Sequence, residues 1–153
     1  MTQYTELGSW RAGRVLVAAA PLAGLLAAGA PAVAAAPPVL AGLTIAPSSV
    51  TVGAGTQVVA TATNTTGAPL DASMGVNVPA TFSVTGVSGT ASCTPRNLTR
   101  LVYCGVQALP PGATATLTFT ATPKTTGTFT FQSYARILYA TDNSLATATL
   151  TVS

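Results

Sequence analysis

Apolar and polar residues alternate along short segments of this chain from about residue 43 onward. The cleanest case is Ala113–Ala121, in which Ala115, Leu117 and Phe119 fall on one side and threonines on the other. Strict alternation has the period of an extended strand with one face buried and one face in water. The pattern therefore predicts half-buried β-strands whose outer faces are rich in threonine.

The other segments show the same alternation, or short runs of β-branched and aromatic residues, between Gly, Pro and Asn turns. Gly86 and Gly89 are expected to separate two short strands. The predicted strands are Leu43–Ile45 with its continuation Val50–Val52, Thr56–Asn64, Leu70–Val78, Phe82–Val84, Ala91–Cys93, Leu101–Val106, Ala113–Ala121, Thr128–Ile137 and Ser144–Val152.

This series of short strands predicts an all-β fold for residues 43–153, with no segment of helical period after the leader. The spacing favours an immunoglobulin-like antiparallel β-sandwich of about seven to nine strands, in which two sheets bury their apolar rows against each other. Residues 35–42 are expected to form a short irregular linker before it.

The first 34 residues have the three-part pattern of a secretory signal. Met1–Arg14 is mostly polar and basic, Val15–Ala30 is apolar, and Ala32-Val33-Ala34 offers small residues for signal peptidase. We expect a signal peptide at 1–34, cleaved after Ala34. The alternative is an uncleaved anchor, but the apolar run is short and prolines interrupt it. No membrane span is expected after cleavage.

Charge is sparse in this chain, which has six Lys or Arg, three Asp or Glu and no His. Without the leader, four cations oppose two carboxylates, for a net charge of +2: Arg96, Arg100, Lys124 and Arg136 against Asp71 and Asp142. Nucleic-acid binding needs clustered Lys and Arg, and so does attachment to an anionic membrane. Neither partner is expected.

Two cysteines, Cys93 and Cys104, both lie in the part expected to be exported. An even count in a small secreted chain predicts a structural disulfide, here closing a loop of about a dozen residues worth on the order of 3 kcal/mol. The alternative is a redox or metal pair. The spacing of the two cysteines does not fit such a site, and the chain has no His to complete a metal site. We expect no metal and no cofactor.

Several motifs, taken in order, resemble a known family. Thr63-Asn64-Thr65-Thr66-Gly67 follows an alternating strand, the paired cysteines come next, and Leu109-Pro110-Pro111-Gly112-Ala113 leads into the threonine-alternating strand. Together they resemble the bacterial conserved-repeat domain of unknown function 11, over about Leu43–Ser153. The resemblance implies an immunoglobulin-like module of surface and exported proteins, with adhesion or wall-associated scaffolding as the expected role. The family carries no general catalytic residues, so the resemblance implies none in this chain.

Residues for acid–base or nucleophilic catalysis are scarce after the leader. The carboxylates Asp71 and Asp142 stand in different turns or strand starts, and a serine nucleophile would have no imidazole base. Lys124 lies in a turn and is expected to be solvated. We therefore predict no catalytic residues and no enzyme.

The basic residues Arg96 and Arg100 lie with Asn97 inside the predicted disulfide loop. They are the candidate binding loop, a small basic lobe that grips an anionic wall polymer or an acidic partner. The alternative interpretation is an ordinary solvated loop.

Three tyrosines, Tyr103, Tyr134 and Tyr139, are candidates for a sugar-binding face. Tyrosines at such positions are more often half-buried strand residues, with an apolar ring and a wet hydroxyl. The sequence leaves both interpretations open.

The sequence thus predicts a secreted, extracellular, non-enzymatic binding or structural module at the bacterial cell surface, retained at the wall or released. Its partner would be a cell-wall polymer or another extracellular protein. The alternative is a secreted inhibitor or effector of an extracellular enzyme, acting through the Cys93–Cys104 loop. Cell fractionation separates the two, because the first predicts protein held with the wall and the second predicts free protein in the medium.

Overall fold

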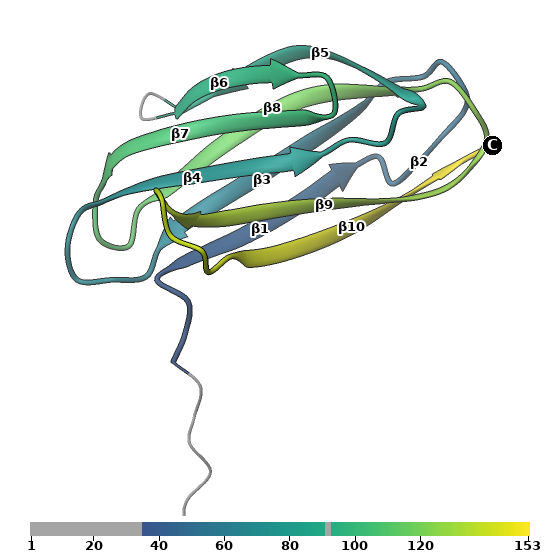
Figure 1. The fold of residues 1–153 in the computed structure, drawn as a ribbon. Helices are drawn as coiled ribbons and strands as arrows, with labels where there is room; N and C mark the ends of the chain where they lie inside the picture. Colours follow the sequence, from purple (N-terminus) through teal and green to yellow (C-terminus); the bar gives the residue numbers. More distant parts are fainter. Residues whose placement is uncertain (1–34, 91–92) are drawn as a thin grey trace, which may run out of the picture. The chain divides into compact units, whose positions relative to one another are not determined.

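The computed structural model describes residues 35–90 and 93–153. The predicted signal peptide at 1–34 lies outside the described residues, as do the first two residues of the strand expected at Ala91–Cys93. Within the described part every regular element is a strand, and no helix there is long and apolar enough to cross a bilayer. Two sheets pack face to face (Figure 1).

Ten strands occur in the described residues. They are β1 (Val39–Ala46), β2 (Ser49–Val50), β3 (Thr56–Asn64), β4 (Leu70–Asn77), β5 (Phe82–Gly89), β6 (Cys93–Leu98), β7 (Leu101–Leu109), β8 (Thr114–Pro123), β9 (Gly127–Ile137) and β10 (Ser144–Val152). The bounds of β3 and β10 are those that alternation predicts.

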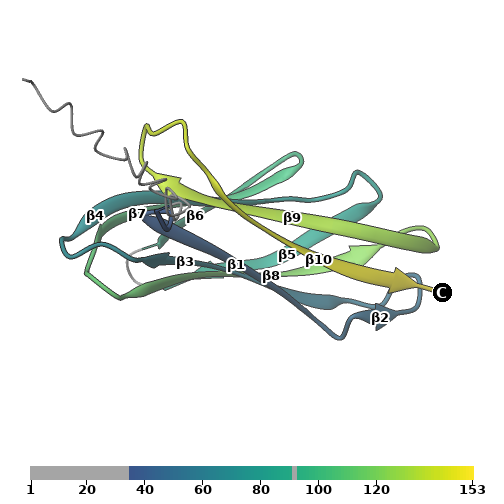
Figure 2. The same ribbon diagram turned by 90° about the horizontal axis from the view of Figure 1, so that it is seen from below.

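One sheet has four strands in the order β1-β3-β8-β5, and the other has six in the order β2-β10-β9-β4-β7-β6. Figure 2 shows β9 and β4 in one layer and β3 and β8 in the other. Neighbouring strands are antiparallel except the short β2, which runs parallel to β10. The predicted all-β, immunoglobulin-like sandwich is confirmed, with one parallel pair added.

The core is formed by the inward rows of both sheets. In β3 the predicted inward residues Val58, Ala60 and Ala62 are fully buried, because they face the other layer while Val59 and Thr61 between them face outward. The largest side chains in the core are aromatic, and the Phe82 and Phe131 rings meet edge to face with centroids 5.1 Å apart. The apolar rows therefore pack as the sequence predicts.

Two of the motifs behind the family resemblance form a single corner. The amide of Asn64 donates to the carbonyls of Ala68 and Leu109, and its side-chain oxygen accepts from Thr66. The backbone oxygen of Asn64 also accepts from Gly112, which has a positive φ of 71°. The Thr-Asn-Thr turn thus holds the Pro-Pro-Gly turn, so these motifs have a structural role.

The predicted linker at 35–42 is too long. Strand β1 begins at Val39, which is buried and pairs with Asn64 at the end of β3. The ladder continues through Gly42 opposite Thr61. Pairing with a regular neighbour extends the strand into residues whose own sequence looks irregular, so only residues 35–38 precede the sandwich.

The predicted break at Gly86 is also wrong. Strand β5 runs from Phe82 to Gly89, and its register against β8 shifts between Thr85 and Ser88. Gly86 adopts a positive φ of 62° at this bulge. A glycine takes that conformation at little cost, so the chain bends there without leaving the sheet.

Candidate functional site

The predicted disulfide between Cys93 and Cys104 is present, with Cα atoms 5.5 Å apart. Cys93 pairs with Val106 and Cys104 with Pro95, so the bond runs diagonally between β6 and β7. Both cysteines are buried. The bond therefore ties an edge strand to its neighbour within one sheet and does not join the two sheets.

The segment closed by this bond is a β-hairpin and not an irregular loop, although Thr94–Leu98 are exposed, as a solvated loop would be. Strand β6 pairs with β7 along its whole length, and only two residues, Thr99 and Arg100, lie between Leu98 and Leu101. Pro95 is tolerated because an edge strand does not need every N–H in a ladder. The hairpin gives each of its residues a fixed face.

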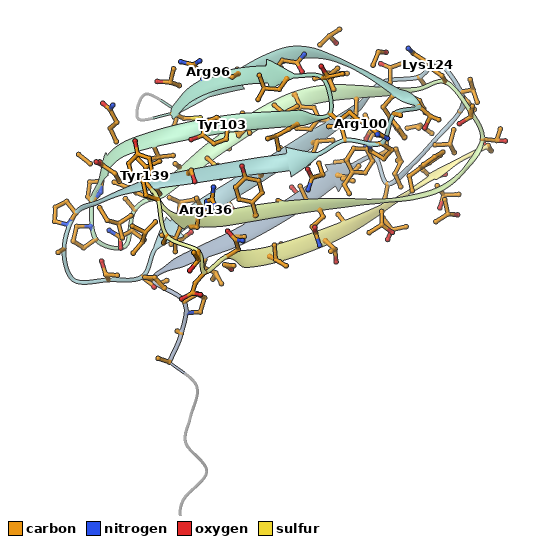
Figure 3. All side chains as sticks on the ribbon, in the orientation of Figure 1. Arg96, Arg100, Tyr103, Lys124, Arg136 and Tyr139 are labelled. Carbon is orange, nitrogen blue, oxygen red and sulfur yellow. A yellow bond between two sulfur atoms is a disulfide. The ribbon has the colours of Figure 1, made fainter. Side chains whose placement is uncertain are left out.

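That fixed geometry places the three candidate binding residues at two separate sites. Arg96 lies opposite Tyr103 on the outer face of the six-stranded sheet. Asn97 and Arg100 line a different hollow, beside Pro79 and at the end of the hairpin. Figure 3 shows Arg96 and Arg100 well separated along β6 and β7. The structure does not bring them together as one basic lobe.

Arg96 belongs to a row that crosses the six-stranded sheet from β6 to β10. Strand register places residues opposite one another in the order Arg96, Tyr103, Gly75, Tyr134 and Leu145. Tyr103, Gly75 and Tyr134 point outward, because their neighbours along each strand are buried. Arg96 and Leu145 share this face through their register with Tyr103 and Tyr134. Two candidate tyrosines thus flank a single glycine.

The glycines of this face explain how the tyrosine rings lie. A β-carbon added at Gly75 would come within 2.8 Å of Cε1 of Tyr134, so the Tyr134 ring occupies the space above that glycine. At Gly105 the nearest atoms are in the Tyr103 ring, at 3.7 and 3.8 Å. Glycine in a strand interior often marks such a close approach. The Tyr134 ring therefore leans across the sheet over Gly75 of β4, whereas the Tyr103 ring leans along its own strand toward Gly105, and both cover the outer surface.

Arg136, two residues beyond Tyr134 on β9, is the cation of this face that the sequence reading did not single out. Its Nε donates to the Ser73 hydroxyl at 3.3 Å and its Nη1 donates to the Ala140 carbonyl at 3.4 Å. Its guanidinium carbon lies 5.7 Å from the centre of the Tyr134 ring, within cation–π range. The Tyr-x-Arg spacing on a strand was the available signal, since residues i and i+2 share a face.

Among the residues that the structure describes, the hydroxyl of Tyr134 is the one group whose pKa is clearly shifted. Burial raises the pKa of Tyr134 above its usual 10.0, the positive charge of Arg136 opposes that rise, and Tyr103 adds to it. The phenol therefore stays neutral at physiological pH and can donate or accept a hydrogen bond.

Tyr139 ends this face at the β9–β10 turn. It is 92 % exposed and has a positive φ of 66°, which is uncommon for an aromatic residue. All three candidate tyrosines line one open groove of about 730 Å³. We call the tyrosine face the outward side chains of Arg96, Leu98, Leu101, Tyr103, Tyr134, Arg136 and Tyr139.

The two carboxylates stand apart from each other. Asp71 accepts a hydrogen bond from the Ala108 N–H at 2.8 Å, where β7 has a positive φ and the β4–β7 register shifts. Asp142 lines a separate hollow with Pro37 and Arg136. In the described segments, no three residues drawn from His, Cys, Asp and Glu are grouped as metal ligands.

Comparison with known proteins gives structural likeness without sequence likeness. No protein-family model matches the chain, and no curated protein matches it. The CARDB domain of the PF1109 protein from Pyrococcus furiosus, solved in complex with di-metal ions, is similar with a TM-score of 0.51 and 16% identity, over 76% of this chain and 93% of that one.

Two other solved structures are similar at the same level. BcpA, the major pilin subunit of Bacillus cereus, has a TM-score of 0.55 and 6% identity, over 74% of this chain and 40% of the pilin. AvmM, which catalyses macrocyclisation in alchivemycin A biosynthesis, has a TM-score of 0.51 and 12% identity, over 75% of this chain and 88% of that one. Such low identities establish the fold alone, an immunoglobulin-like β-sandwich that hosts unrelated functions.

Proposed function

We propose that this chain is an exported, non-enzymatic binding module of the bacterial cell surface, and that the tyrosine face contacts its partner. The observation that carries the proposal is the pair Tyr103 and Tyr134, which form an open aromatic surface with Arg96 beside the first ring and Arg136 beside the second. Tyrosine and arginine are the residues that binding surfaces favour, because each offers both contact area and hydrogen bonds.

The rigidity of this surface supports the proposal. Tyr103 and Tyr134 are half-buried above glycines, and Arg136 is held by hydrogen bonds to Ser73 and Ala140. Side chains that are already ordered lose little entropy when a partner binds. The face is therefore suited to recognition without rearrangement.

Export and the surface location rest on three supports. The first 34 residues have the pattern of a cleavable leader, the sandwich is stabilised by a disulfide, and one structural neighbour is a pilin subunit. The resemblance to the bacterial conserved-repeat domain points the same way. The non-enzymatic part rests on this chain's own residues, namely the two separated carboxylates and the lack of histidine in the sequence. The structural neighbours do not supply that argument, because one of them, AvmM, is itself a catalyst.

One observation favours the inhibitor alternative. The tip of the β6–β7 hairpin presents Leu98, which is 52 % exposed, next to the exposed Arg100, and the Cys93–Cys104 bond braces this hairpin. A braced hairpin tip with an exposed apolar side chain is a shape that an enzyme cleft can accept. This function would leave the tyrosine face without a role.

Fractionation of the bacterial host expressing the full chain tests the proposal. We expect the wild type in the cell-wall fraction and the double variant Tyr103→Ser/Tyr134→Ser in the medium. The matched control is Thr116→Ser/Thr118→Ser, which alters the opposite sheet and should stay with the wall. Wild-type protein found only in the medium would overturn the proposal, and so would a double variant retained as strongly as the wild type.

A further inference from the structure

Building on the proposed function, we infer that the tyrosine face binds an acidic polysaccharide. Its sugar rings would stack on Tyr103 and Tyr134, and its carboxylates would pair with Arg96 and Arg136. Four features of the face support this assignment: its length, its charge, the free donors of its arginines and the open shape of its groove.

The length of the row suits a short run of sugar rings. Arg96 and Tyr134 stand three strands apart, on β6 and β9, and strands lie ~4.8 Å apart, so the row extends for about 14 Å. Tyr103 lies within this row on β7, Gly75 separates it from Tyr134, and Arg136 follows two residues beyond Tyr134 along β9. A linear polymer laid across the strands would meet Arg96, then Tyr103, then Tyr134, with Arg136 beside the second ring.

The charge of the face is complementary to an anion. The groove that the three tyrosines share is lined by Arg96 and by no Asp or Glu. Arg100 extends the positive side, because it lines a neighbouring hollow with Asn77 and Gln132, which are outward residues of β4 and β9. Three of the four cations after the leader thus border this sheet.

Neither Asp71 nor Asp142 lines the groove of the tyrosine face, so these carboxylates leave its positive charge largely intact. Asp71 accepts a hydrogen bond from Ala108, and Asp142 lines the separate hollow with Arg136 and Pro37. A guanidinium has five N–H donors, of which Arg136 uses two on Ser73 and Ala140. The remaining donors suit a carboxylate, the planar anion that arginine binds best with two parallel hydrogen bonds.

The aromatic rings argue for a polymer of sugar rings rather than a chain of phosphates. A polyol phosphate could pair with the arginines but has no flat apolar face to cover Tyr103 and Tyr134. An acidic protein could offer carboxylates, but a stable protein interface buries a well-packed apolar centre. Here the groove is open, and its apolar side chains, Leu98, Leu101 and Leu138 among them, share the lining with Arg96, Thr94, Gln107 and the three tyrosines.

The test is titration of the processed wild-type protein with oligogalacturonate, a polymer of uronic acid, followed by calorimetry. We expect binding that weakens about tenfold in Arg96→Gln, the loss expected for one charge-assisted hydrogen-bonding group. We expect a similar loss in Tyr103→Ser, which removes the stacking surface. Lys124→Gln makes the same charge change at the β8–β9 turn, away from this face, and should bind like the wild type.

Three further probes decide the chemistry. The methyl ester of the same oligomer keeps the rings without the charge, and we expect it to bind at least about tenfold more weakly. Polyglutamate keeps carboxylates without sugar rings, and a glycerol phosphate polymer keeps anions without rings. Equal binding of any of these three would overturn the polysaccharide assignment.

The outcome also separates this inference from the proposed function. If oligogalacturonate does not bind, yet the wall fraction still retains the protein in a manner that depends on Tyr103 and Tyr134, the polysaccharide assignment fails and the surface-binding function stands. If retention is also independent of those tyrosines, both are wrong.

Discussion

The two outer faces of this sandwich obey the same alternation but carry different side chains. On the four-stranded sheet, the outward row of β8 is Thr114, Thr116, Thr118 and Thr120, and it lies against outward residues of β3. We call this the threonine face. The hydroxyls of Thr63 and Thr114 on this face lie 2.8 Å apart and form a hydrogen bond.

The tyrosine face instead places large rings over glycines and sets guanidiniums beside them. Threonine rows provide strand propensity and solubility, and they offer a partner little area. Rings and guanidiniums add binding surface that the strands do not need for pairing. The contrast teaches that alternation specifies the layers, while the choice of outward side chains decides which layer offers aromatic and cationic surface to a partner.

The largest expected effect is on the hairpin that carries part of the tyrosine face. Replacing Cys93 and Cys104 together with Ala should lower the free energy of unfolding by about 3 kcal/mol, because the unfolded chain regains the freedom of the closed loop. Urea denaturation measures the change. Amide exchange should show lost protection in β6 and β7, with β3 and β8 unchanged, and equal loss in both sheets would contradict the comparison.

The next effect comes from the glycine beneath the tyrosine ring. Gly75→Ala should destabilise the fold by about 1–3 kcal/mol, because the new methyl group meets Tyr134 and Leu101 in a packed site. The Tyr134 ring would move, and tyrosine fluorescence of protein beginning at Ala35 reports this without interference, because that protein lacks Trp10, the single tryptophan of the sequence. An unchanged spectrum with full stability would show that the ring does not rest on Gly75.

A matched change on the threonine face is Gly42→Ala, where the neighbour would be the Thr61 hydroxyl. It should leave wall retention intact, while Gly75→Ala should reduce retention. Similar losses in both variants would mean that binding depends on general stability and not on one face.

These contrasts also show how much the sequence could predict. The bounds of β3 and β10 follow from alternation alone, since each has a clean apolar row. Strand β6 could not be found that way, because Thr94 to Leu98 have no alternating apolar row and join the sheet only by pairing with β7. Long-range pairing overrides local preference at such an edge.

The candidate site was predictable in its parts but not in its assembly. Tyr103, Tyr134 and Arg96 were recognisable as candidates, yet their meeting depends on the register of β6, β7, β4 and β9. That register joins residues far apart in sequence, so no local pattern encodes it. The same strand pairing places Arg100 at the turn between β6 and β7, away from Arg96.

A smaller effect concerns pH. Because burial raises the pKa of Tyr134 in the folded state above its usual 10.0, the folded protein holds this proton more tightly than the unfolded chain does. The resulting stability is fully present below about pH 10 and is lost as the pH rises through the higher folded pKa. Tyr134→Phe should flatten this alkaline decline in thermal denaturation, and an identical decline in the variant would contradict the assignment.

The smallest expected effect is on the threonine face. Thr118→Ala should change the free energy of unfolding by no more than about 0.5 kcal/mol, since outward strand positions away from special contacts tolerate substitution. Wall retention should be unaffected. A larger loss, measured by urea denaturation, would mean that this face contributes more than solubility.

The most direct test of the central claim is NMR mapping of the processed domain titrated with wall polymer from its host. The account predicts amide shift changes around Tyr103, Gly75, Tyr134 and Arg136, with β8 and β3 unperturbed. Shift changes confined to the threonine face, or to the Leu98–Arg100 hairpin tip, would contradict it.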